Sequence, residues 1–202
     1  MPSLRSGLFA AGGLLAVGAI AAGVYGVLTA EPPEPATPPF KGVIATPFLM
    51  PGKTRPPTVP AAAANLPDDE PVIGVTAGGR ARSYWVRTFT GVAGHVVNDV
   101  VGGVPVTVTH WPQDGRSRVF TGDGSDPLPV MTGGFTDGLL LKVGDSMFHQ
   151  RDGRPLNGSG PSFPYPDLAF QEVPWHVWRT AHPDTDVYVG DAPPKPPAGK
   201  VN

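Results

Sequence analysis

One segment of the chain carries side chains that could bind a metal ion or transfer a proton. His95 and Asp99 are four positions apart, Asn98 adjoins Asp99, and His110 follows across a predicted hairpin. If the segment is a strand, His95 and Asp99 share a face, because strand side chains repeat every two residues. With His110 they would form a small metal or acid–base site.

A structural role explains the same residues more simply. Asn and Asp side chains commonly hydrogen-bond the backbone at turns, so His95, Asn98 and Asp99 would then fix the hairpin. The sequence has no His-x-x-x-His or Glu-x-x-His pair, no Gly-x-Ser-x-Gly elbow and no phosphate-binding loop with its lysine. We therefore favour the structural role and expect no catalytic residue, no metal ion and no cofactor.

The hairpin that must position these residues is the clearest structural signal. Val104, Val106 and Val108 alternate with Pro105, Thr107 and Thr109, the pattern of a strand with β-branched residues on one face. Gly102 and Gly103 separate this strand from residues 96–101 and can adopt the positive φ of a tight turn. The sequence predicts a central hairpin of two strands, 96–101 and 104–111.

Other turn signals place this hairpin in a mainly β domain over residues 71–191. Gly78-Gly79 and Gly144-Asp145 predict two further hairpins, and residues 118–121 and 186–189 predict short strands. Residues 175–181 predict one brief helix between Pro174 and Pro183. We expect a short-stranded antiparallel sheet, a sandwich or a partly open barrel.

Tryptophans mark both the predicted helix and a second kind of candidate site. Trp175 and Trp178 are three apart and share a helix face, which we expect to pack on the sheet. Such side chains also anchor protein interfaces. A ligand-binding cleft lined by Trp85, Trp111 or Trp175 is a further alternative.

Composition limits the class of protein. The 202 residues include 27 Gly and 27 Pro, which suits short strands, turns and extended linkers better than a helical bundle. The net charge of -2 argues against a nucleic-acid partner, because phosphate binding needs a basic surface. The absence of cysteine excludes disulfides, thiolate metal sites and c-type haem attachment.

Residues 1–30 predict an N-terminal transmembrane anchor. Residues 7–30 carry no charge, and as a helix they would span about 36 Å, enough to cross a bilayer core of about 30 Å. Arg5 precedes the run, whereas Glu31 and Glu34 follow it. By the positive-inside rule, we expect a single-pass inner-membrane protein with its C-terminal domain in the periplasm.

A stripe of small residues runs along one face of the predicted anchor. Its members are spaced 4, 3, 4 and 3 positions apart: Gly12, Ala16, Ala19, Gly23 and Gly26. Small residues let a second helix approach closely in lipid, where packing drives association. An anchor rich in Ala and Gly also produces such a stripe by chance. The functional interpretation is contact with other integral membrane proteins.

Residues 31–70 predict an extended, proline-rich arm. Twelve prolines occur in the 41 residues from Glu31 to Pro71, a density that favours polyproline II. Apolar side chains interrupt the prolines, and a disordered spacer would rarely carry so many. We expect these to contact the protein's own domain or a partner, foremost Phe40, Phe48, Leu49 and Met50. Residues 192–202 form a second proline-rich segment, the predicted tail.

Three blocks of sequence resemble a known prokaryotic family. They are the run 78–84, the block 95–99 with 102–106, and the ending 175–179 with 182–185. In this order they are similar to domain of unknown function 3179. The resemblance covers about residues 65–191 and implies an exported or membrane-associated domain without an established activity.

The chain departs from that family pattern at one informative segment. After the strand that ends in VPVTVT, members of the family usually carry two cysteines, often as CPLC. Here the segment is His110 to Arg116, HWPQDGR, and contains neither. If the cysteines of the family bind metal or do redox work, this chain does not do so in the same way, which favours a scaffold.

These observations favour a non-catalytic accessory subunit. The anchor, the arm and the β domain would together stabilise a larger membrane complex, and an energy-converting assembly, respiratory or photosynthetic, is the host that we consider. The alternatives are a metal-dependent enzyme that uses His95, Asp99 and His110, and a periplasmic ligand-binding domain.

Overall fold

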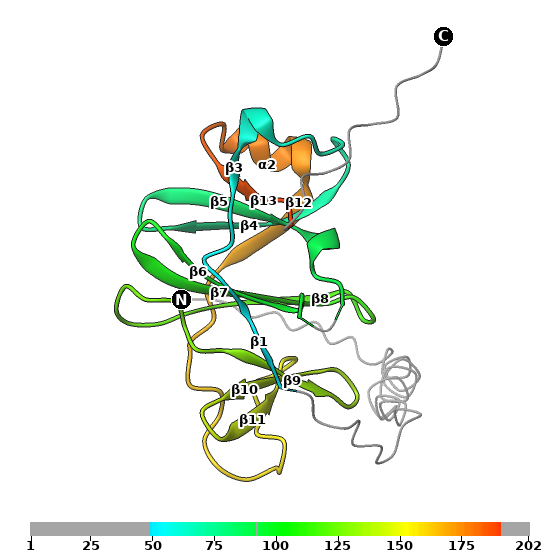
Figure 1. Ribbon diagram of the computed structural model, residues 1–202, viewed down its shortest axis with the longest axis vertical. Helices are drawn as coiled ribbons and strands as arrows, with labels where there is room; N and C mark the ends of the chain where they lie inside the picture. The colour runs from blue at the N-terminus through cyan, green and yellow to red at the C-terminus, as the bar shows by residue number, and fades with distance from the viewer. Residues whose placement is uncertain (1–48, 92, 191–202) are drawn as a thin grey trace, which may run out of the picture. The chain divides into compact units, whose positions relative to one another are not determined.

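The computed structural model describes residues 49–91 and 93–190 (Figure 1). These residues form two 3-10 turns, η1 (Ala61–Ala63) and η2 (Val86–Thr88), one helix, α2 (Trp175–Ala181), and a set of short strands. The strands are β1 (Met50–Pro51), β2 (Lys53–Thr54), β3 (Val59–Pro60), β4 (Pro71–Ala77), β5 (Arg80–Trp85), β6 (Val96–Val101), β7 (Val104–Trp111), β8 (Arg116–Thr121), β9 (Met131–Phe135), β10 (Leu139–Val143), β11 (Ser146–His149), β12 (Phe170–Pro174) and β13 (Asp186–Tyr188).

The strands make three sheets. Sheet A has the order β1-β9-β10-β11, sheet B the order β2-β6-β7-β8, and sheet C the order β12-β4-β5-β13-β3. Most neighbours are antiparallel, but β13 pairs with β5 in parallel and β2 pairs with β6 in parallel. The prediction of a mainly β fold with one short helix is confirmed; sheet A is purely antiparallel, whereas sheets B and C are mixed.

Sheet B is the middle layer, with a hydrophobic core on each face. On one face, Val97 and Val108 of sheet B pack in one core with Ile73 and Tyr84 of sheet C. On the other face, sheet B contributes Val96, Trp111 and Phe120 to a core shared with Leu139 and Leu141 of sheet A. Figure 1 shows β6, β7 and β8 between the strands of sheets C and A. Burial on both faces explains why nearly every side chain of β7 is buried.

Helix α2 covers the other face of sheet C. Trp175 and Trp178 are both buried and pack with Val72 and Val187 of that sheet. Gly74 of β4 makes this contact close, because a Cβ at that position would lie 2.3 Å from two ring atoms of Trp178. The predicted packing of the two tryptophans on the sheet is confirmed.

The three predicted hairpins are confirmed as β4–β5, β6–β7 and β10–β11. The first two of these hairpins touch at their turns, at Gly78 and Gly102, which have φ of 53° and 58°. A Cβ on Gly102 would lie 2.5 Å from the Ala77 carbonyl oxygen, and one on Gly78 would lie 2.0 Å from the Gly102 carbonyl oxygen. Glycine at both turns therefore allows sheets B and C to approach at this end.

We expect Gly102→Ala to destabilise the domain more than Gly103→Ala. Both glycines have positive φ, at 58° and 84°, so alanine costs about 1–2 kcal/mol of backbone strain at either position. Only Gly102 faces another backbone, whereas a Cβ on Gly103 meets nothing within 4 Å. Overpacking should add about 1–3 kcal/mol at Gly102. Urea unfolding followed by tryptophan fluorescence measures both, and equal losses would contradict the close approach of the turns.

The arm is part of the folded domain from Met50 onward. The strands β1, β2 and β3 occupy an edge of sheets A, B and C in turn, although each is only two residues long. The folded domain thus includes residues 50–60, which the sequence analysis assigned to the linker. The prolines are compatible with this pairing, because an edge strand needs ladder donors on one side only.

Several predicted features lie outside the described residues. These are the whole predicted anchor with its small-residue stripe, the part of the arm up to residue 48 with Phe40 and Phe48, and the tail 192–202. Within the residues that the structure describes, no helix has the length and apolar character to cross a membrane. Of the arm residues, Leu49 is 49% exposed, whereas Met50 pairs with Thr132 of sheet A.

Candidate functional site

Asn98 and Asp99 are neighbours on β6 and connect the middle sheet to different partners. Asn98 is buried, its side-chain amide donates to the Val130 carbonyl at 2.8 Å, and its side-chain oxygen accepts from the Thr107 hydroxyl at 2.8 Å. Val130 belongs to the core between sheets B and A. Because successive strand side chains point to opposite faces, Asp99 is directed towards sheet C.

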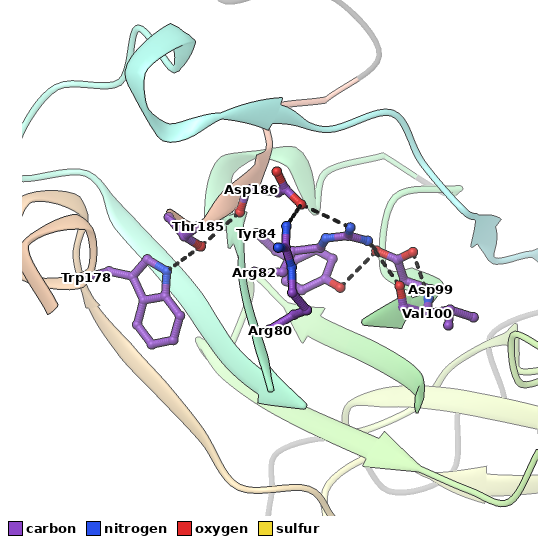
Figure 2. Close-up of polar contacts among 8 residues, drawn as sticks. All are labelled: Arg80, Arg82, Tyr84, Asp99, Val100, Trp178, Thr185 and Asp186. Carbon is purple, nitrogen blue, oxygen red and sulfur yellow. Dashed lines mark hydrogen bonds and ion pairs between the residues drawn. The ribbon is translucent and has the colours of Figure 1, made fainter. Parts of the chain in front are cut away.

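Asp99 is the centre of a buried charged network (Figure 2). Its Oδ2 accepts hydrogen bonds from Arg82 at 2.7 Å and from the Tyr84 hydroxyl at 3.0 Å, both on β5. Its Oδ1 accepts from the Val100 amide at 2.8 Å. The side chains of Asp99 and Arg82 are 3% and 18% exposed, so the pair is largely removed from water. A buried pair of this kind needs hydrogen bonds to offset its desolvation. Both oxygens of Asp99 have partners, whereas the buried Nε of Arg82 has none among the described residues.

The network continues through Arg82 to β13. The second guanidinium nitrogen of Arg82 lies 3.4 Å from Asp186, and Arg80 lies 3.9 Å from the same carboxylate. Figure 2 shows Arg82 between the two carboxylates, and Trp178 of α2 reaching the start of β13. The Trp178 indole donates to the Thr185 hydroxyl at 3.0 Å, next to Asp186. Three layers, α2, sheet C and sheet B, are thereby linked by polar contacts.

Burial and neighbouring charges shift the pKa values of two members of this network. Burial, together with the charge of Asp99, raises the pKa of Tyr84 well above its usual value, so the phenol stays protonated. Burial alone would lower the pKa of Arg82, but the hydrogen bond and charge of Asp99 outweigh it and raise that pKa. Both shifts favour the protonated forms of Tyr84 and Arg82.

His95 and His110 lie opposite each other at the open end of the β6–β7 hairpin. His95 directly precedes β6, and His110 is near the C-terminal end of β7. The His110 amide donates to the His95 carbonyl at 3.2 Å, which makes the two residues cross-strand neighbours. The His95 ring packs on Trp111 with centroids 4.9 Å apart, and the His110 ring packs on Phe89 at 5.9 Å. The side chains are 7% and 4% exposed, and we call these two residues the histidine pair.

A chain of hydrogen bonds connects His110 with the protein surface. The Ser117 hydroxyl donates to Glu172 of β12 at 2.8 Å, and Ser117 Oγ lies 2.9 Å from His110 Nδ1. Since the single hydroxyl proton is used by Glu172, Ser117 Oγ must accept from His110 Nδ1–H. The neutral form of His110 therefore carries its proton on Nδ1, and Nε2 is the basic nitrogen. This order also means that His110 does not activate Ser117 as a nucleophile.

The structure brings together only two of the four predicted polar residues. His95 and His110 are neighbours, whereas Asp99 is bonded to Arg82 and Tyr84, and Asn98 is bonded towards sheet A. Across residues 49–91 and 93–190, no three His, Asp or Glu side chains are grouped so as to hold a metal ion. Asn98 and Asp99 bond across layers rather than only within their own hairpin.

Sequence reasoning missed the partners that define both polar clusters. These are Arg82, Tyr84 and Asp186 around Asp99, and Ser117 and Glu172 beside His110. The spacing of Arg82 and Tyr84, two apart on a strand, does indicate a shared face. Their partner on β6 is fixed only by how the two sheets stack.

The tryptophans proposed as alternatives for lining a cleft, Trp85, Trp111 or Trp175, belong to two cores. Trp111 packs between sheets B and A. Trp175, the first residue of α2, is buried in the core between α2 and sheet C, and Trp85 is partly buried against that same core. A different groove of about 450 Å³ lies beside the loop before β6. Its lining includes Thr88, Thr90, Ala93 and Gly94 from that loop, Met50 from β1 and Tyr188 from β13.

Comparison with known proteins gives one match. A family model described as "Protein of unknown function (DUF3179)" matches residues 49–195, nearly three quarters of the chain. The matched region starts at the strands of the arm, in agreement with the boundary of the folded domain. No curated protein and no solved structure gives a significant match.

Proposed function

The chain belongs to the DUF3179 family of proteins of unknown function, and from that premise we propose that it is a non-catalytic, membrane-anchored structural subunit. In this proposal its partners are other integral membrane proteins of a larger complex. The anchor lies in the inner membrane and the β domain in the periplasm, and a respiratory or photosynthetic assembly is the host that we consider.

The observation that carries the proposal is the path of the arm through the domain. Residues 50–60 form an edge strand of each sheet in turn: Met50 pairs with Thr132, Lys53 with Val97, and Val59 with Val187. A chain held in three sheets transmits position and force from its N-terminal side to the whole domain. This is the mechanical requirement for an anchored subunit that must keep a fixed place.

The polar residues support the same function. The hydrogen bonds of Asp99 and Asn98 join sheet B to its neighbours. In this proposal, two of the polar residues considered for a catalytic site therefore contribute to stability. The competing proposal, a metal-dependent enzyme that uses Asp99 with His95 and His110, requires Asp99 to leave Arg82 and Tyr84. That separation would leave a buried guanidinium without its closest counter-charge.

We expect a full-length protein with a C-terminal tag to be recovered from native membranes with partners in a fixed ratio. Mild-detergent extraction, affinity purification and mass spectrometry measure this. Removal of residues 1–39, with a cleavable export signal in their place, should release the domain into the periplasm without those partners. Recovery of the full-length protein alone, with stoichiometric metal that is lost in His95→Ala, would favour the enzyme instead.

The small-residue stripe provides a matched control for the same experiment. Gly23→Ile places a large side chain on the stripe and should abolish co-purification, because close helix packing in lipid depends on small residues. Val24→Ile adds one methylene on the adjacent face and should retain the partners. If both variants keep the complex, the predicted helix contact is wrong, whatever the role of the β domain.

A further inference from the structure

The histidine pair is unusual because two ionisable rings are buried next to each other. His95 and His110 are cross-strand neighbours, and neither is more than 7% exposed. Among the described residues, the buried His95 Nδ1 has no hydrogen-bond partner. Nε2 of His110 is the unprotonated nitrogen, as the chain through Ser117 and Glu172 requires. The pair thus fits its surroundings when both rings are neutral.

In the part of the chain that the structure describes, few negatively charged groups lie close enough to the histidine pair to stabilise its protonated form. Glu172 of β12 and Asp114 of the β7–β8 turn act on His110, and Asp114 is itself paired with Arg116 at 3.5 Å. The charge of His110 in turn acts on His95. Phe89 and Trp111 complete the surroundings with apolar rings. Protonation would therefore place one or two cations in a largely apolar site.

The pair also supports a wall of the groove beside it. Phe89 is fully buried and rests on the His110 ring, and its neighbours Thr88 and Thr90 line the groove of about 450 Å³. Gly94, directly before His95, lines the same groove. A change at the pair therefore acts on two parts of the groove wall, one through Phe89 and one through the backbone at His95.

We propose that the histidine pair is a pH-sensitive switch, in which proton uptake separates Phe89 and His95 from the end of the β6–β7 hairpin and opens the groove wall. The neutral pair holds the closed arrangement. The switch is local, because α2 and its contacts with sheet C contain neither histidine of the pair.

The direction of the pH effect follows from burial. Burial lowers the pKa of both histidines; the carboxylates of Glu172 and Asp114 act against this at His110, and the backbone of His110 and Phe89 acts against it at His95. The open form binds protons with the ordinary pKa of about 6.5, so the closed form is fully favoured above that pH. It loses this advantage as the pH falls from about 6.5 towards the lowered pKa values.

Hydrogen exchange on the full-length protein in mild detergent tests the proposal. Between about pH 7.5 and pH 5, after correction for intrinsic exchange, we expect exchange at residues 86–97 and 108–117 to increase severalfold, because proton uptake favours the open form. Peptides from β4 and α2 should keep their protection. A uniform increase over the whole domain would mean global acid unfolding and would overturn the proposal, as would no change at either segment.

Single substitutions distinguish the contribution of the histidine pair to this pH dependence from that of another histidine. His95→Gln and His110→Gln should each remove most of the pH dependence, whereas His149→Gln, on β11, should keep it. Glu172→Gln provides a test that does not remove a ring from the core: without this carboxylate the pKa of His110 in the closed form falls further below that of the open form, so proton uptake favours opening more strongly and opening should begin at higher pH. A shift to lower pH, or equal effects of all three histidine variants, would overturn the assignment.

Discussion

Replacing Asp99 with leucine is expected to destabilise the domain by about 3–5 kcal/mol, because it leaves a buried charge without its partner. Arg82 is 18% exposed and would keep only one counter-charge, Asp186, at 3.4 Å and itself partly exposed, together with the neutral Val100 carbonyl at 3.3 Å. The Tyr84 hydroxyl would also lose its acceptor. Urea unfolding of the full-length protein measures the loss. All four tryptophans lie in the β domain, so fluorescence reports that domain alone.

Two controls identify the cause of this loss. The double variant Arg82→Met with Asp99→Leu should be more stable than Asp99→Leu alone, because it removes the unpaired charge together with its partner. Asp186→Asn should cost about 1 kcal/mol or less, as expected for a partly exposed ion pair. If Asp99→Leu behaves like Asp186→Asn, the buried network does not hold sheets B and C together.

Trp178→Ala should have a comparably large effect, about 3–5 kcal/mol, because it leaves a cavity between α2 and sheet C. The side chain is 2% exposed and packs with Val72 and Val187. Its indole also donates to the Thr185 hydroxyl, which would keep only its own bond to the Asp186 carbonyl. The same unfolding measurement applies, with the remaining three tryptophans as reporters.

The paired test uses Gly74, on which Trp178 rests. Gly74→Ala should destabilise the protein by about 1–3 kcal/mol in the presence of Trp178, since the added Cβ would lie 2.3 Å from the ring. In the Trp178→Ala background the added methyl meets the space left by the indole, and the loss should largely disappear. Additive losses would contradict the direct contact of these two residues.

Local signals in the sequence accounted for much of the fold. Gly102-Gly103 located the central turn, and the alternation of Val104, Val106 and Val108 located its second strand, because turn geometry and strand periodicity are encoded within a few residues. The helix was predicted at its observed bounds, 175–181. Five of the described strands were not predicted. Three of them, β1, β2 and β3, are two-residue strands of the arm, and the other two, β9 and β12, have the sequences MTGGF and FQEVP, which contain glycine or proline and show no clear alternation.

The candidate site was predicted only in part. His95 and His110 were expected to meet across the hairpin, and they do, because antiparallel register follows from the turn. Asp99 was expected to join them and instead bonds to Arg82 and Tyr84. Periodicity placed Asp99 on a face of the strand, but it carried no information about which sheet covers that face.

The sequence by itself therefore determined the hairpins, the helix and the family, since each depends on contacts between residues close in the chain or on motifs read directly. Only the tertiary structure decided that sheet B is buried on both faces and that residues 50–60 join all three sheets. It also decided the partners of Asp99 and His110. These features depend on pairs such as Ser117 with Glu172, which are 55 positions apart and become neighbours only when the layers stack.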